Sequence, residues 1–176
     1  MDPKVTVLTT VYNTNLDHLR ECVESILNQT YKDFKFLIID DASPDKRVFD
    51  FLKSFQDPRI FLLKNEKNLG VSDTINKALS LTDSKYIIRA DHDDVSFPKR
   101  IEEQVKFLEK NPHLSAICSW EITIDELGKK SRSWEINIEN YGDFLGPILL
   151  GICPIWHPSL AFKREDIIEI GGFNKN

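Results

Sequence analysis

The sequence predicts an α/β fold with a mostly parallel sheet that carries helices on both faces. Short apolar runs alternate with amphipathic runs of helical period along residues 5–110, and this alternation is typical of parallel strands joined by crossover helices. Polar clusters directly follow three of the apolar runs, at residues 10–13, 40–41 and 91–94. Because ligands bind beyond the carboxyl ends of strands in such sheets, the three clusters predict one shared site.

The elements of the first half follow from local patterns. The predicted strands are short runs of apolar and β-branched residues, at 5–10, 34–39, 59–63 and 85–89. The predicted helices have apolar residues at helical spacing, at 15–29, 48–55, 70–81 and 98–110. Asn15 is of the type preferred as an N-cap, and Pro98 suits the first turn of the last helix. We expect that helix to bury Ile101, Val105, Phe107 and Leu108.

The second half is less regular. We expect strands at 116–120 and 131–136, a short helix at 141–150, a further strand reached through 157–162, and a helix at 164–170. No repeat, low-complexity segment or linker divides the chain, so residues 1–176 are expected to form a single domain.

Composition limits the class of protein. Hydrophobic residues make up 41% of the 176 residues and charged residues 29%, as in soluble globular proteins. The formal net charge of -5 argues against a nucleic-acid binder that works by broad phosphate neutralisation. The longest apolar stretch, at 145–155, is short and broken by Gly and Pro, so no membrane span is expected.

Cysteine usage and the first residues suggest a compartment. Cys22, Cys118 and Cys153 have no metal-binding spacing, and their odd number fits a reduced cytosolic protein. Cys22 lies in a helical pattern and Cys118 in an apolar run, so both are expected in the core. The chain begins without a charged and then apolar leader. These features predict a cytoplasmic protein.

The segment Arg89-Ala90-Asp91-His92-Asp93-Asp94 follows the apolar run 86–88. Carboxylates near a buried strand end need a partner or a cation, because removing them from water is costly. No run of Lys or Arg lies beside them in sequence. Divalent cations such as Mg²⁺ and Mn²⁺ take oxygen ligands and bridge to phosphates, so a metal with a phosphorylated ligand is one explanation. A polar loop that caps the next helix is the alternative.

Several motifs together resemble those of family 2 inverting glycosyltransferases. They occur in the family's order at residues 7–13, 38–45, 68–70, 91–98, 157–159 and 171–173. The resemblance covers essentially the whole chain, and the motifs are weak singly but specific together. It implies a GT-A fold, in which the mostly parallel sheet is Rossmann-like. Residues 1–95 would form the nucleotide-binding half, and 96–176 a partial acceptor-side half.

The resemblance assigns the nucleotide to Thr10, Tyr12, Asp41, Gly70 and Asp91. A tyrosine ring can stack on a base, and a carboxylate at Asp41 can accept the N3 hydrogen of uracil. Gly70 opens a helix whose free N–H groups could face the nucleotide. A half-buried aromatic at a strand end remains the alternative for Tyr12. Asp40 is expected to hold the loop.

For a metal, the resemblance points to Asp93 with Mn²⁺ or Mg²⁺, and Asp91 and His157 are further candidate ligands. A buried, hydrogen-bonded histidine or an acceptor contact is the alternative for His157. His92 is expected to be structural.

Contacts to the donor or acceptor sugar are expected from Arg89, Asp94, Trp120 and Glu121. Arg89 could instead pair with one of the nearby aspartates.

The function implied is transfer of a sugar from a UDP-sugar to a hydroxyl of a glycan or lipid-linked acceptor, in surface polysaccharide or glycoconjugate synthesis. The general base of an inverting reaction matches no residue here and is expected beyond Asn176, which suggests a fragment of a longer protein. A full-length protein could lie at the inner face of the membrane through further sequence.

Three other functions are considered against the same residues. A nucleotide-sugar-binding domain without activity is the first alternative for this chain. A sugar nucleotidyltransferase is less favoured, because residues 9–13 contain no glycine and no basic residue to hold a triphosphate. A dinucleotide-dependent oxidoreductase lacks its glycine-rich loop after the first strand.

Overall fold

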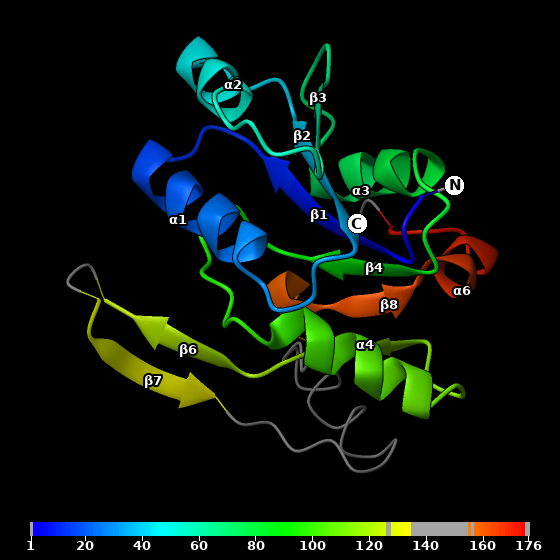
Figure 1. Cartoon of the computed structure of the whole chain (residues 1–176). Coiled ribbons are helices and arrows are strands. Elements are labelled where there is room, and N and C mark those ends of the chain that lie inside the picture. The colour runs from blue at the N-terminus through cyan, green and yellow to red at the C-terminus, as the bar shows by residue number, and fades with distance from the viewer. Residues whose placement is uncertain (1, 126–127, 135–154, 156, 175–176) are drawn as a thin grey trace.

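The computed structural model describes residues 2–125, 128–134, 155 and 157–174. Its main sheet has six strands in the order β3-β2-β1-β4-β8-β5 (Figure 1). Their bounds are β1 (Val5–Val11), β2 (Phe34–Asp40), β3 (Ile60–Lys64), β4 (Tyr86–Arg89), β5 (Ala116–Ile117) and β8 (Ala161–Lys163). Strands β3, β2, β1 and β4 are parallel, and β8 lies antiparallel between β4 and β5. The predicted class, a mostly parallel α/β sheet, is confirmed.

Helices cover both faces of the sheet, as predicted. The described helices are α1 (Leu16–Leu27), α2 (Lys46–Lys53), α3 (Val71–Ser80), α4 (Arg100–Lys110) and α6 (Arg164–Glu169). One core lies between the sheet and α1, α2 and α4, and a second core lies between the other face and α3 and α6. Successive residues of a strand point to opposite faces, so Val7 joins the first core and Leu8 the second.

Local capping confirms where two of these helices begin. The side chain of Asn15 accepts a hydrogen bond from the Asp17 amide at 2.8 Å, at the start of α1. The side chain of Asp45 accepts one from the Arg47 amide at 2.9 Å, at the start of α2. Each side chain satisfies an amide that has no partner inside its helix.

The buried face of α4 differs from the prediction. Phe107 is 51% exposed, and Gln104 takes its place beside Ile101 in the buried set. At 100° per residue, Phe107 lies about 120° around the helix from Ile101, whereas Gln104 lies about 60° away. The buried amide of Gln104 is satisfied by the Ser159 carbonyl and the Ser119 hydroxyl. Pro98 lies two residues before α4, not in its first turn.

The predicted strand at 116–120 is shorter than expected. Strand β5 ends at Ile117, and Cys118 beyond it is exposed, so the expected core role of Cys118 is wrong. Cys22 is buried in α1, as predicted. The chain then forms an antiparallel hairpin of β6 (Glu121–Ile124) and β7 (Lys130–Trp134), which stands apart from the main sheet in Figure 1. The predicted helix at 141–150 and Cys153 lie outside the described residues.

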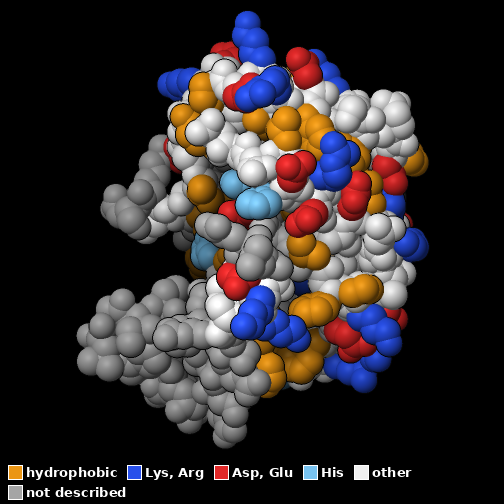
Figure 2. Space-filling model, turned by 90° about the vertical axis from the view of Figure 1, so that its left-hand side faces the viewer, with side chains coloured by type: hydrophobic (Ala, Val, Ile, Leu, Met, Phe, Trp, Pro, Cys, Tyr) orange, Lys and Arg blue, Asp and Glu red, His pale blue; other side chains and the backbone are white. Residues whose placement is uncertain are grey.

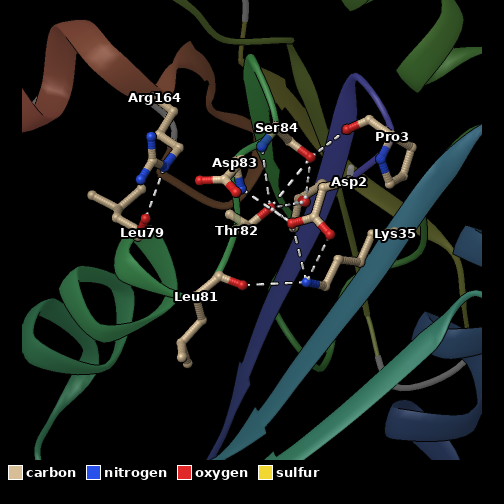
Figure 3. A network of polar contacts seen from close by, with 10 residues as sticks. Asp2, Pro3, Lys35, Leu79, Leu81, Thr82, Asp83, Ser84 and Arg164 are labelled. Carbon is tan, nitrogen blue, oxygen red and sulfur yellow. Dashed lines mark hydrogen bonds and ion pairs between the residues drawn. The ribbon is translucent and has the colours of Figure 1, made fainter.

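Polar contacts tie the amino ends of β1 and β2 to the turn before β4 (Figure 3). The Asp2 carboxylate accepts hydrogen bonds from Lys35 Nζ at 3.2 Å, Thr82 Oγ1 at 2.8 Å and the Asp83 amide at 3.1 Å. Lys35 Nζ also donates to the Leu81 carbonyl at 3.2 Å. This network is remote from the carboxyl ends of the strands, where the polar clusters lie. No helix within the described residues is long and apolar enough to cross a membrane.

Candidate functional site

The three polar clusters of the sequence meet at one pocket, as the parallel topology requires. The pocket has a volume of about 270 Å³ and lies beyond the carboxyl ends of β1, β2 and β4. Its described lining is Thr10, Val11, Tyr12, Asp41, Val71, Arg89, Asp91, His92, Asp93 and His157. Figure 2 views the molecule from the side toward which β1 and β4 point in Figure 1, and it shows histidine and acidic side chains close together in the middle of that face.

The loop after β1 presents one aromatic ring to solvent. Tyr12 is 47% exposed, whereas Thr10 before it is buried. The next residue, Asn13, has a positive φ of 48°, and its amide donates to Ser43 Oγ at 3.1 Å. That bond fastens the β1 loop to the β2 loop. An exposed ring on a fixed loop suits stacking on a flat ligand.

Asp41 is bound inside the protein rather than free in the pocket. Its carboxylate accepts from the Leu69 and Gly70 amides at 2.9 and 2.8 Å, and from Asn65 Nδ2 at 2.6 Å. The residue is 3% exposed. Three donors on one buried carboxylate make a strong anchor, because hydrogen bonds to an ionised acceptor are stronger than neutral ones. Asp41 therefore fixes residues 69–70 against the β2 loop.

The neighbouring Asp40 also holds this loop, as predicted. Its Oδ1 accepts from the Ser43 amide at 2.9 Å, and its Oδ2 pairs with Lys64 Nζ at 3.0 Å.

Gly70 differs from the prediction in what its amide does. The expectation was a free N–H at a helix start, but this N–H donates to Asp41 Oδ2. Gly70 is the N-cap of α3 with φ 80° and ψ 167°. A side chain there would be strained although nothing lies within 4 Å of the Cβ position. Gly70 is therefore required for its backbone conformation. Val71, the next residue, lines the pocket.

Arg89 links Asp91 and His157 at the end of β4. Its NH2 group pairs with Asp91 Oδ1, and its NH1 group contacts Nδ1 of His157. The Arg89 side chain is 2% exposed, and its Nε is buried with no partner among the described residues. Burial lowers the pKa of Arg89, and the Asp91 carboxylate opposes that shift. The alternative expected for Arg89, a pair with a nearby aspartate, is thus observed, and its contact with a sugar stays a prediction.

Asp93 has an exposed carboxylate in the acidic loop, which comprises residues 91–94. Its side chain is 57% exposed, and its Oδ1 lies 3.8 Å from His92 Nδ1. His92 Nδ1 lies closer to Thr14 Oγ1, at 2.8 Å. Exposed oxygens on the pocket wall fit a divalent cation that takes its remaining ligands from a bound molecule and water. Among the described residues, no three His, Cys, Asp or Glu side chains form a ready-made metal site.

Two further charged residues, Arg100 and Glu121, interact electrostatically with the acidic loop. No sequence pattern identified Arg100 as a residue of this site. Its NH1 donates to Ser96 Oγ at 2.9 Å, and its NH2 donates to the Arg89 carbonyl. Burial, and then the Asp93 and Asp91 carboxylates, raise the pKa of Asp94, and Arg100 opposes that shift. In the sequence, Arg100 is distinguished only by its place near the start of the helix that follows Pro98. That place does not show which way its side chain points.

Glu121 lies at the start of β6, behind the same loop. Burial, and then Asp94 and Asp91, raise its pKa. Its Oε1 is buried with no hydrogen-bond partner among the described residues. Trp120 before it is 59% exposed. Neither residue belongs to the described pocket lining, so their contact with a sugar stays a prediction, as does that of Asp94.

Comparison with known proteins gives a consistent family. A profile described as glycosyl transferase family 2 matches residues 6–171. An uncharacterized glycosyltransferase of Methanocaldococcus jannaschii is 42% identical over 128 residues, which are 72% of this chain and 44% of that protein. The chain thus spans less than half the length of this relative.

Solved structures share the fold. The mannosyltransferase PcManGT of Pyrobaculum calidifontis, in complex with GDP-Man and Mn²⁺, superposes with a TM-score of 0.70 at 23% identity, covering 99% of this chain and 48% of that one. Residues 1–349 of S. aureus TarS, in complex with UDP-GlcNAc, superpose with a TM-score of 0.72 at 16% identity, covering 95% and 47%. At these identities the likeness concerns the fold.

Proposed function

The chain belongs to glycosyl transferase family 2, and from that premise we propose that it takes part in transfer of a sugar from a UDP-sugar to an acceptor hydroxyl with inversion. One observation carries the proposal. The exposed ring of Tyr12 and the exposed carboxylate of Asp93 line one pocket at the carboxyl end of the sheet. An aromatic ring can stack on the base at one end of a nucleoside diphosphate, and a carboxylate can hold a cation that binds the diphosphate at the other end.

The residues would divide the donor between them. Tyr12 stacks on the base. Asp41 acts indirectly, by anchoring the loop of residues 68–70. Thr10 and Gly70 shape the same side of the pocket. Asp93 would hold Mn²⁺ or Mg²⁺ together with the diphosphate. Such a cation offsets the charge that develops on the leaving nucleoside diphosphate. Asp91, two residues before Asp93, is held by Arg89.

The acceptor is proposed to be a glycan or lipid-linked hydroxyl in surface polysaccharide synthesis. The attacking hydroxyl must lose a proton to a general base. We assign that role to neither Asp41 nor Asp91, because internal partners hold both carboxylates. Asp93 is committed to the cation.

Calorimetry tests the donor side. We expect UDP to bind more tightly with Mn²⁺ than in EDTA, and more tightly than GDP or dTDP. Asp93→Ala should reduce UDP affinity in Mn²⁺ to the level measured in EDTA. Asp50→Ala is the matched control, because Asp50 is exposed on α2 and lies outside the described pocket lining. Equal UDP affinity with and without Mn²⁺ would contradict the role given to Asp93.

A second measurement tests turnover. We expect release of UDP from a UDP-sugar to be slower in Asp93→Ala than in the wild type and Asp50→Ala. A wild type that binds UDP-sugars without releasing UDP would favour the alternative of a binding domain without activity in this chain.

A further inference from the structure

The contact between Arg89 and His157 fixes a chemical property of the histidine. A guanidinium has five N–H donors and no acceptor. The Arg89 NH1 group faces Nδ1 of His157, so Nδ1 must accept through its lone pair. A neutral imidazole carries one proton, which is therefore on Nε2. A protonated imidazole would place an N–H group against the N–H groups of Arg89.

We propose that Arg89 is a positioning residue that holds His157 as the neutral tautomer with its proton on Nε2, so that His157 donates a hydrogen bond to a phosphate oxygen of the bound nucleoside diphosphate. In this arrangement Nδ1 is occupied and Nε2 has no lone pair. His157 is then not a metal ligand. The identity of the ligand rests on the proposed function, whereas the tautomer rests on the contact alone.

A second contact keeps the imidazole ring in place. The Phe173 ring meets it edge to face, with centroids 5.6 Å apart and planes at 84°. Phe173 is itself fixed to α3, because its amide donates to Asn76 Oδ1 at 2.8 Å and its carbonyl accepts from Asn76 Nδ2 at 2.9 Å. The ring is thus held by Arg89 and Phe173, while His157 remains exposed in the pocket lining.

The negative charge of the pocket lining favours an N–H donor at His157 if a phosphate is to bind there. The described lining contains Asp41, whose carboxylate is bound by internal donors, and the carboxylates of Asp91 and Asp93. The one Arg or Lys there is Arg89, whose charge is shared with Asp91. These carboxylates repel a diphosphate. A neutral N–H donor attracts a phosphate oxygen without competing with Arg89 for Asp91. Partial burial, and then the charge of Arg89, lower the pKa of His157, which also favours the neutral ring.

Nuclear magnetic resonance tests the tautomer without any ligand. In chain labelled with ¹⁵N-histidine, we expect the His157 signals of a ring protonated at Nε2, with the Nδ1 shift displaced by an accepted hydrogen bond. Arg89→Met should remove that displacement, and Arg89→Lys should keep part of it. His92 is the internal reference, since its Nδ1 contacts Thr14. A proton on Nδ1 in the wild type would overturn the proposal, even where Arg89→Met does not fold.

Matched variants test the donor in calorimetry with UDP. Glutamine can place an N–H near the position of Nε2, and asparagine can place one only near Nδ1. We expect His157→Asn to weaken UDP binding by roughly tenfold, the value of one hydrogen bond to a charged group, with the same factor in EDTA and in Mn²⁺. His157→Gln should stay within about threefold of the wild type.

The outcomes separate this inference from the proposed function. A loss in His157→Asn that appears only with Mn²⁺ would make His157 a metal ligand and overturn the inference. Wild-type binding in both variants would also overturn it. If the wild type binds none of UDP, GDP and dTDP, the proposed function and the phosphate contact both fail. The Nδ1 signal then still decides the effect of Arg89 on the tautomer.

Discussion

The buried carboxylate of Asp41 offers a sharp test of how this pocket is built. In Asp41→Asn, Oδ1 can still accept from Leu69 and Asn65, but the new NH₂ group would face the Gly70 amide. One partly buried N–H then loses its acceptor, at a cost of about 2 kcal/mol. The two remaining bonds change from charged to neutral acceptors, at about 0.5 kcal/mol each. The expected loss of unfolding free energy is therefore about 3 kcal/mol.

Urea unfolding, followed by circular dichroism and extrapolated to zero denaturant, measures this loss. In a chain of this size it should also lower the Tm by about 6–12 °C. Asp93→Asn is the matched control, with the same substitution in the same pocket. Because the Asp93 side chain is 57% exposed and accepts no described hydrogen bond, we expect a change below about 0.5 kcal/mol. An Asp41→Asn variant as stable as Asp93→Asn would refute the anchoring role of Asp41.

Three further changes test the same account by urea or thermal unfolding. Burial, and then Asp94 and Asp91, raise the pKa of Glu121 above 4.5, so its ionised form destabilises the folded state as the pH rises past that value. Glu121→Gln should be more stable than the wild type near pH 7 and about equal to it near pH 4, and a constant difference would contradict this. Despite burial, hydrogen bonds from Thr82 and Asp83 and the Lys35 pair hold the pKa of Asp2 below 3.8. Asp2→Asn should lose about 1 kcal/mol near pH 7, and less as the pH falls through the folded pKa; equal stability near pH 7 would count against this network. Gly70→Ala should lose about 1–3 kcal/mol because of its positive φ, and an unchanged Tm would show that the backbone relaxes.

The sequence alone determined the order of the elements over residues 5–110 and the edge of the sheet where the pocket lies. Strands and helices leave periodic patterns over a few residues, because each must bury one face. Parallel strands then bring their carboxyl ends together whatever the details of packing. For this reason the sequence pattern alone places Thr10, Tyr12, Asp91 and Asp93 at one site, and the pocket lining contains them all.

Only the tertiary structure decided what these side chains bind. Asp41 turns toward the amides of residues 69–70, and Arg89 meets His157, which lies 68 positions further along the chain. The antiparallel strand β8, which follows His157, makes that meeting possible by pairing beside β4. Periodicity reports which face of an element is buried, but hydrogen bonds between distant segments depend on the final packing. The proposed metal ligand and the anchoring aspartates therefore look alike in sequence, as aspartates at strand ends, and differ in the donors that the folded chain brings to them.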